Sequence, residues 1–204
     1  MRDYKTRIDL YLFSGNGDKS SSNGSGEVKF YNLRPQGFLY DPSKYEGCIL
    51  SLSSFQSMPM DQTSVDAIVK TSSTYIDSSI HFQILEAAQP NSITNFNSDT
   101  AGNGVSSYSS NAGILQTLEW DNALTLTGHG SNDNKYALKY RASDPLAEGL
   151  YISNPLESFT VRIVNSRNET VNLSNTTKDD DTDSSTDTSW SAHVIIQPIL
   201  RTFG

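Results

Sequence analysis

The chain has 204 residues with a net charge of −8, and this length predicts one domain with its own hydrophobic core. The negative charge disfavours nucleic-acid or anionic-membrane binding driven by overall charge. The composition is not that of a coiled coil, which needs Ala, Glu, Lys, Leu and Arg in bulk. Cys48 is the single cysteine, so an intrachain disulfide is excluded and folding needs no oxidising compartment.

The first residues are charged, at Arg2, Asp3 and Lys5, and no apolar segment follows them. This pattern predicts no secretory signal peptide. No apolar run approaches the ~18 residues that a membrane-spanning helix needs. We therefore expect a protein without a membrane span that is made in a cytosol.

Apolar and polar residues alternate in short segments along the chain, which is the period of a β-strand. In the first segment, Ile8, Leu10 and Leu12 share one face. No segment keeps a helical period over ten residues. Strands are predicted over 4–13, 27–32, 47–55, 64–70, 79–87, 114–120, 122–128, 135–141, 148–152, 157–165 and 190–200.

Three stretches, 14–26, 89–113 and 178–189, combine few apolar residues with much Gly, Ser, Asn or Asp. Burial cannot repay the entropy of ordering such segments, so we predict mobile loops there. About ten short strands without a helical pattern predict an all-β fold. The expectation is a single jelly-roll-type antiparallel β-sandwich over residues 1–204.

The last two predicted strands, 157–165 and 190–200, are expected to pair with each other. Sequential strands are usually neighbours, and antiparallel pairing tolerates a long connection such as 166–189. Phe159, Val161 and Ile163 alternate on the first of these strands, as apolar residues do on the second. We therefore predict one hairpin with both apolar faces in the core.

The side chains that could take part in catalysis or metal binding do not form a known motif. The sequence contains no nucleophile elbow, zinc-binding helix motif, phosphate-binding loop or dinucleotide fingerprint. His81, His129 and His193 are interpreted as surface or hydrogen-bonded residues, and Cys48 as a buried inert thiol. Paired carboxylates can catalyse glycoside hydrolysis, and the candidates are Asp61, Asp66, Glu86, Glu119 and Asp121. Because the chain has 23 acidic residues, such pairs arise easily by chance and carry almost no information about function. We predict no enzyme, no catalytic residue and no cofactor.

The acidic segment 178–189 is the most unusual part of the sequence. Asp179, Asp181 and Asp183 alternate as they do at the start of several calcium-binding loops. An EF-hand would next need Gly and Glu, where this chain has Ser184 and Trp190. We interpret the segment as a solvated loop and predict no metal site.

The carboxy-terminal quarter, with FTVRIV, TVNLS and WSAHVIIQPIL, resembles the last hairpin of viral jelly-roll capsid proteins. The likeness is to minor capsid and penton-type proteins of large double-stranded DNA viruses and virophages. It implies a virion subunit that stabilises an icosahedral shell through the major capsid protein and other minor capsid proteins, or as a homo-oligomer. It also implies assembly in a host cytoplasm and no active site. The matching residues are Phe159, Val161, Ile163, Val171, Leu173, Trp190, Val194 and Ile196.

The alternative interpretation is a carbohydrate- or receptor-binding β-sandwich, such as a lectin or a fibre domain. Trp120, Tyr136, Tyr140 and Tyr151 could form a platform on which a sugar stacks, and Tyr136 and Tyr140 share a strand face. Aromatic residues are also favoured in cores and on sheet faces, which is the more frequent role. A β-sandwich hydrolase is a third, weaker hypothesis.

Overall fold

The computed structural model describes twelve strands, one α-helix and two short 3₁₀ helices. The described residues are 7–31, 45–60, 62–69, 78–87, 95–97, 106–108, 113–125, 134–144, 149–152, 158–166, 168–173 and 189–200. The elements are β1 (Ile8–Phe13), η1 (Ser14–Asn16), β2 (Asp18–Ser20), β3 (Gly24–Phe30), β4 (Tyr45–Ser57), α1 (Gln62–Val69), β5 (Ile80–Ile84), η2 (Leu85–Ala87), β6 (Asn95–Asn97), β7 (Ser106–Tyr108), β8 (Ile114–Thr125), β9 (Asn134–Arg141), β10 (Leu150–Ile152), β11 (Phe159–Asn165) and β12 (Trp190–Leu200).

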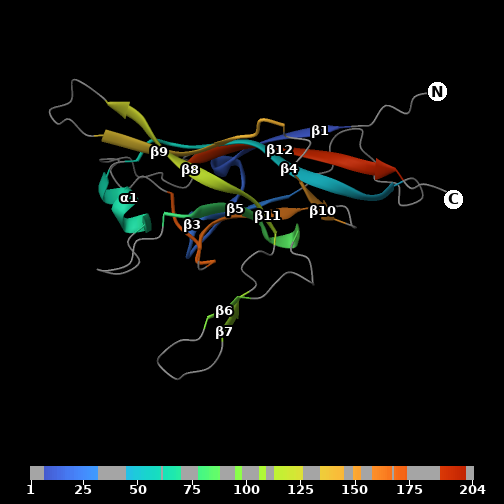
Figure 1. The fold of residues 1–204 in the computed structure, drawn as a ribbon, viewed down its shortest axis with the longest axis horizontal. Helices are drawn as coiled ribbons and strands as arrows, with labels where there is room; N and C mark the ends of the chain where they lie inside the picture. The colour runs from blue at the N-terminus through green and yellow to red at the C-terminus, as the bar shows by residue number, and fades with distance from the viewer. Residues whose placement is uncertain are drawn as a thin grey trace.

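Ten of these strands form one curled antiparallel sheet in the order β1-β12-β4-β9-β8-β5-β11-β3-β2, with β10 also paired to β4. The long strand β8 joins the two layers of the sandwich (Figure 1). Its first half pairs with β5, and its second half pairs with β9. One layer therefore contains β1, β12, β4 and β9, and the other contains β3, β11 and β5.

The strands of five or more residues form nested pairs. In chain order these strands are β1, β3, β4, β5, β8, β9, β11 and β12. The first pairs with the last, β3 with β11, β4 with β9, and β5 with β8, each antiparallel. Nested pairs wound around one core are the topology of a jelly roll. The predicted all-β, jelly-roll-type sandwich is confirmed.

The core between the layers is centred on Trp190, which is 1% exposed. The rings of Phe30, Phe55 and Phe82 surround its indole at centroid distances of 6.1, 5.8 and 6.3 Å. The indole Nε1–H donates a 2.7 Å hydrogen bond to the carbonyl oxygen of Ser25 on β3. Trp190 therefore connects β12 to the opposite layer through both ring packing and a buried hydrogen bond.

The predicted hairpin of 157–165 with 190–200 is wrong. Strand β11 pairs with β3 and β5, whereas β12 pairs with β1 and β4. In this nested winding β12 pairs with β1 in one layer, and β11 pairs with β3 in the other. The last two long strands therefore belong to opposite layers. The predicted faces are nevertheless correct: Phe159 and Val161 enter the core from one layer, and Trp190 and Val194 enter it from the other.

The predicted strand 64–70 is also wrong, because this segment is the helix α1. Val65, Ile68 and Val69 are its buried residues, and their spacing places them on one helical face. Two further predicted strands, 114–120 and 122–128, fall largely within one continuous strand, β8, which passes from one layer to the other. In the described part of the chain, no helix has the length and hydropathy needed to cross a membrane.

The stretch 14–26 is not a loop over most of its length, since it contains η1, β2 and the start of β3. Ser14 is fully buried, and its Oγ accepts hydrogen bonds from the backbone N–H groups of Ser189 and Trp190 at 2.6 and 3.2 Å. These polar bonds, which composition does not reveal, give the segment a fixed place. Within 89–113 the structure contains the β6–β7 hairpin, and residues 178–188 lie outside the described residues.

Candidate functional site

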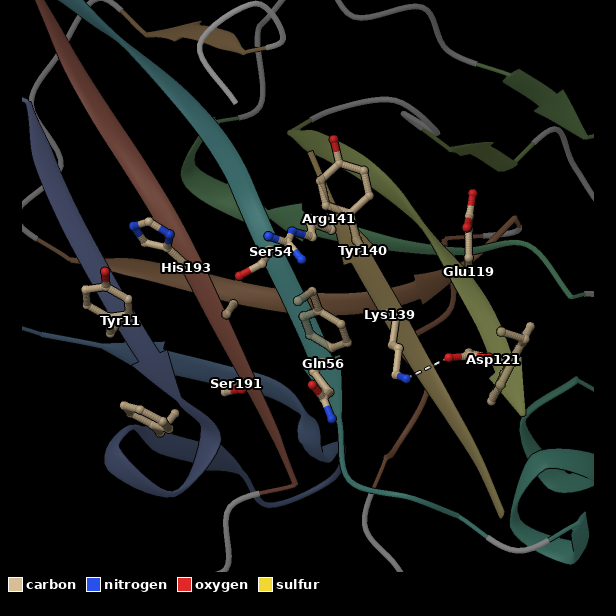
Figure 2. Close-up of a pocket in the computed structure, with 14 residues that line it drawn as sticks. Tyr11, Ser54, Gln56, Glu119, Asp121, Lys139, Tyr140, Arg141, Ser191 and His193 are labelled. Carbon is tan, nitrogen blue, oxygen red and sulfur yellow. Dashed lines mark hydrogen bonds and ion pairs between the residues drawn. The ribbon is translucent and has the colours of Figure 1, made fainter. Parts of the chain in front are cut away.

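A groove of about 700 Å³ crosses the outer face of the layer formed by β1, β12, β4 and β9, and continues onto β8. Figure 2 shows its side chains rising from all of these strands, with Tyr11 at one end and Asp121 at the other. Neighbouring strands are about 4.8 Å apart, so the groove spans roughly 19 Å across the sheet. We refer to it as the outer-face groove.

The strand register arranges the groove side chains in two rows. Alternate residues of a strand point to the same face, so residues at matching positions on adjacent strands lie side by side. The first row, in spatial order, is Tyr11, His193, Ser54 and Arg141. The second row is Phe13, Ser191, Gln56, Lys139 and Glu119.

The β1 end of the groove is aromatic. Tyr11 is 67% exposed and Phe13 is 41% exposed, although both belong to a regular strand. The Tyr11 and His193 rings stack with centroids 4.5 Å apart and planes 6° from parallel. An open apolar surface therefore lies beside the polar middle of the groove.

A hydrogen-bonded chain holds the His193 ring in place. Its Nε2 bonds to Oδ1 of Asp9 at 2.8 Å, and Nη2 of Arg7 donates to the same oxygen at 2.7 Å. Burial alone would raise the pKa of Asp9, but the hydrogen bonds from Arg7 and His193 hold it below its ordinary value of 3.8. An ionised Asp9 fixes the imidazole against which Tyr11 stacks.

The β8–β9 end of the groove is charged and balanced. Nζ of Lys139 forms an ion pair with Oδ2 of Asp121 at 2.6 Å. Glu119 lies opposite Lys139 in the register, and Arg141 ends the first row. Two cations and two anions thus give this end no formal net charge.

The aromatic platform, which the sequence offered only as the alternative to packing in the core or on a sheet face, is not assembled. Trp120, Tyr136 and Tyr140 are partly buried against the core, and Tyr151 lies on β10. Trp120 and Tyr140 border the outer-face groove, but Nε1 of Trp120 donates to the carbonyl oxygen of Ser78 at 3.2 Å. The open rings of the groove are those of β1. Their signal in the sequence is that Ile8–Phe13 has large apolar residues on both faces.

The other candidate residues are occupied by structural contacts. Nδ1 of His81 is hydrogen-bonded to Oγ1 of Thr117 at 3.0 Å. Glu86 accepts hydrogen bonds from the backbone N–H and hydroxyl of Thr160 at 2.6 and 2.7 Å. Burial raises the pKa of the Cys48 thiol to about 11. Among the carboxylates, Asp66 accepts a hydrogen bond from Gln62 on α1.

Two sequence candidates, Asp61 and His129, lie outside the described residues. Within the described ranges, no group of three or more His, Cys, Asp or Glu side chains is arranged to hold a metal ion.

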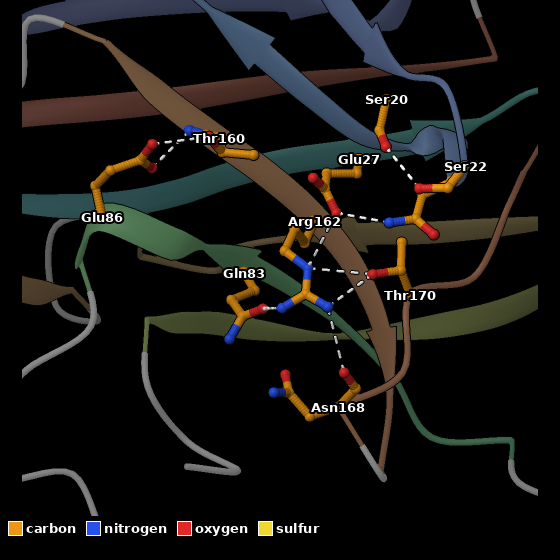
Figure 3. Close-up of polar contacts among 10 residues, drawn as sticks. Ser20, Ser22, Glu27, Gln83, Glu86, Thr160, Arg162, Asn168 and Thr170 are labelled. Atoms are coloured by element: carbon orange, nitrogen blue, oxygen red, sulfur yellow. Dashed lines mark hydrogen bonds and ion pairs between the residues drawn. The ribbon is translucent and has the colours of Figure 1, made fainter. Parts of the chain in front are cut away.

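A second polar cluster lies on the outer face of the other layer, around Arg162 of β11 (Figure 3). Its guanidinium donates to Oγ1 of Thr170 at 2.7 and 3.1 Å and to Oε1 of Gln83 at 3.4 Å. It also lies 3.6 Å from Oε2 of Glu27 and donates to the carbonyl oxygen of Asn168 at 3.4 Å. These bonds tie β3, β5 and the segment after β11 together, so the cluster has a structural role.

Comparisons with family models, with curated proteins and with solved structures find no match to this chain. The candidate site is therefore defined by the chain's own geometry, and the outer-face groove is its principal feature.

Proposed function

We propose that this protein is a structural subunit of a virion, a minor capsid protein that stabilises an icosahedral shell through protein–protein contacts. The observation that carries the proposal is the jelly-roll topology with its nested strand pairs, an architecture that viral capsid domains use. The same architecture also serves as the scaffold of lectins and cupins.

The residues that resemble those of capsid proteins support the proposal in a second way. Phe159, Val161 and Ile163 on β11 are completely buried, as is Val194 on β12. Val171, Leu173, Trp190 and Ile196 belong to the same core. The hairpin of the resemblance is absent, since β11 and β12 do not pair, and the likeness that remains lies in residues that shape the sandwich.

A capsid subunit acts by burying its surface against neighbours, with major and minor capsid proteins as partners. A specific contact of this kind buries about 1,000 Å² or more. Among the described strands, β1 pairs on one side only, with β12, so its other edge offers backbone groups for such a contact. The proposed place of action is the virion, assembled in the host cytoplasm.

The test is the composition of purified particles. Particles banded on a density gradient, from cultures that encode this chain, should contain it at a fixed ratio to the most abundant shell protein. That ratio should survive a second gradient and a high-salt wash, whereas an adhering host protein of similar abundance should be lost. If the chain is expressed in the cells but absent from banded particles, the proposal is wrong.

A further inference from the structure

We propose that the outer-face groove is a binding site for a neutral oligosaccharide, which lies across the strands from Tyr11 to Glu119. This inference concerns the isolated chain and does not depend on the proposed role in a virion. It rests on the chemistry of the two rows, on their charge balance and on the way their side chains are held.

The middle of the groove has the hydrogen-bonding chemistry that sugar hydroxyls need. Ser54, Ser191 and Gln56 lie next to one another on β12 and β4. Each serine hydroxyl and the glutamine amide can both donate and accept a hydrogen bond. A sugar hydroxyl also does both, so a row of such groups matches a row of hydroxyls.

The β1 end offers the apolar surface on which a sugar ring can rest. Tyr11 and Phe13 are two positions apart on one strand, which places their Cα atoms about 6.8 Å apart and both side chains on the same face. Both rings are exposed, and together they form an apolar surface that a ligand can cover. The C–H face of a pyranose is apolar and suits such rings.

The charges of the groove favour a neutral ligand. Lys139 is neutralised by Asp121, and Arg141 is balanced by Glu119 within the same two rows. An anionic ligand such as a phosphate or a nucleic acid would find no net positive charge here, in a chain whose net charge is −8. Charged groups in this arrangement still provide strong hydrogen bonds to hydroxyls.

The same residues argue against a second copy of the chain as the occupant. The centre of a protein–protein contact is depleted of charged residues and of serine, and it is enriched in aromatic anchors. Here the exposed aromatic rings, Tyr11 and Phe13, lie at one end, and two serines and Gln56 lie in the middle. A hydroxylated ligand satisfies these groups, whereas an apolar anchor would leave them unpaired.

The groove is held in its binding shape before a ligand arrives. Tyr11 stacks on His193, which bonds to Asp9, and Lys139 is held by Asp121. Side chains that are already ordered lose little conformational entropy on binding. Affinity then depends on the contacts themselves.

The test uses the full chain on an array of neutral, sialylated and sulfated oligosaccharides, followed by calorimetric titration with the strongest neutral glycan. Tyr11→Ala should weaken binding about tenfold or more because it removes a stacking surface. Gln56→Ala should weaken binding by a similar factor, because a hydroxyl of the glycan loses its hydrogen bond to the Gln56 amide. Tyr11→Phe, which keeps the ring, should stay within about threefold of the wild type.

Tyr31→Ala is the matched control, since Tyr31 is 52% exposed and follows β3 in the other layer. Its affinity should equal that of the wild type, and circular dichroism should show all four variants folded. The proposal is overturned if no neutral glycan binds with a Kd below about 1 mM, if sialylated or sulfated glycans bind in preference, or if Tyr11→Ala binds normally. It is equally overturned if Tyr11→Ala abolishes a dimer seen by light scattering. Particle composition is measured separately, so failure here leaves the capsid proposal to its own test.

Discussion

Tyr11 and His193 occupy matching positions on β1 and β12, and their rings are nearly parallel at a centroid distance of 4.5 Å. One residue comes from the first described strand and the other from the last. The aromatic end of the outer-face groove therefore exists only when β1 and β12 are paired.

The first prediction concerns Asp9, whose pKa in the folded chain lies below 3.8. A lowered carboxyl pKa adds stability that is fully present above the unfolded-state value and is lost as the pH falls through the folded-state value. The difference in unfolding free energy between the wild type and Asp9→Asn should therefore be larger at about pH 6 than at about pH 2. Urea denaturation at both pH values measures it.

Arg7→Ala gives the comparison for this prediction, because it removes one of the two side chains that hydrogen-bond to Asp9. In that background, the pH-dependent part of the Asp9→Asn effect should shrink. An effect that stays constant between the two pH values, or grows in acid, would show that Asp9 does not stabilise the fold as a carboxylate.

The second prediction concerns the indole of Trp190. Trp190→Phe leaves the buried carbonyl oxygen of Ser25 without its hydrogen bond and opens a small cavity among the rings. We expect a loss of about 2–4 kcal/mol in unfolding free energy, measured by urea denaturation. Trp120→Phe is the matched control, with an expected cost below about 1 kcal/mol, because its indole N–H bond is exposed. Equal losses in the two variants would contradict the central role of Trp190.

The third prediction compares two phenylalanines. Phe159 is completely buried on β11, whereas Phe13 is exposed on β1. Phe159→Ala should lower the unfolding free energy by about 3–5 kcal/mol, and Phe13→Ala by less than about 1 kcal/mol. Thermal unfolding followed by circular dichroism measures both. The assignment of the core fails if Phe159→Ala is as stable as Phe13→Ala.

The fourth prediction concerns the thiol of Cys48, whose pKa is raised from 9.0 to about 11 by burial. At equal pH its thiolate fraction is about 100-fold below that of an ordinary cysteine, and the folded chain also blocks access. Reaction with a chromogenic disulfide at about pH 8 should be at least about 100-fold slower in the native chain than in urea.

A surface thiol calibrates that measurement. Ser143→Cys in a Cys48→Ser background places the thiol on an exposed residue after β9. This variant should react at similar rates in the native and the unfolded chain. Rapid labelling of native Cys48 would show that β4 opens readily at this position.

The strand faces could be predicted from the sequence, and the strand partners could not. Ile80, Phe82 and Ile84 alternate because one face of β5 is buried, and all of them are indeed in the core. The same alternation in β11 and β12 says nothing about which distant strand each one joins. Nearness in sequence favoured a hairpin, but the nested winding places the two in opposite layers.

The helix α1 and the outer-face groove were missed for related reasons. Three buried residues, Val65, Ile68 and Val69, are too few for a helical period to stand out in a short segment. The outward position of Tyr11 could be predicted from alternation with Leu10 and Leu12. Its neighbours Ser54, Gln56 and Arg141 come from other strands, so only the register brings them to the groove.

The insertion of β12 between β1 and β4 has a consequence for biosynthesis. β1 is synthesised first among the described strands, and its partner β12 is synthesised last. The core residues Ile8 and Leu12 therefore lack their packing partners on β12 until the intervening chain has been translated. Such distant pairings make folding slow and leave apolar strands open to misassembly in the meantime. A chain cut short before Trp190 would keep β1 and β4 and lose the strand that joins them. Quality control in the producing cell should therefore treat such fragments as unfolded, even though most of the core residues are present.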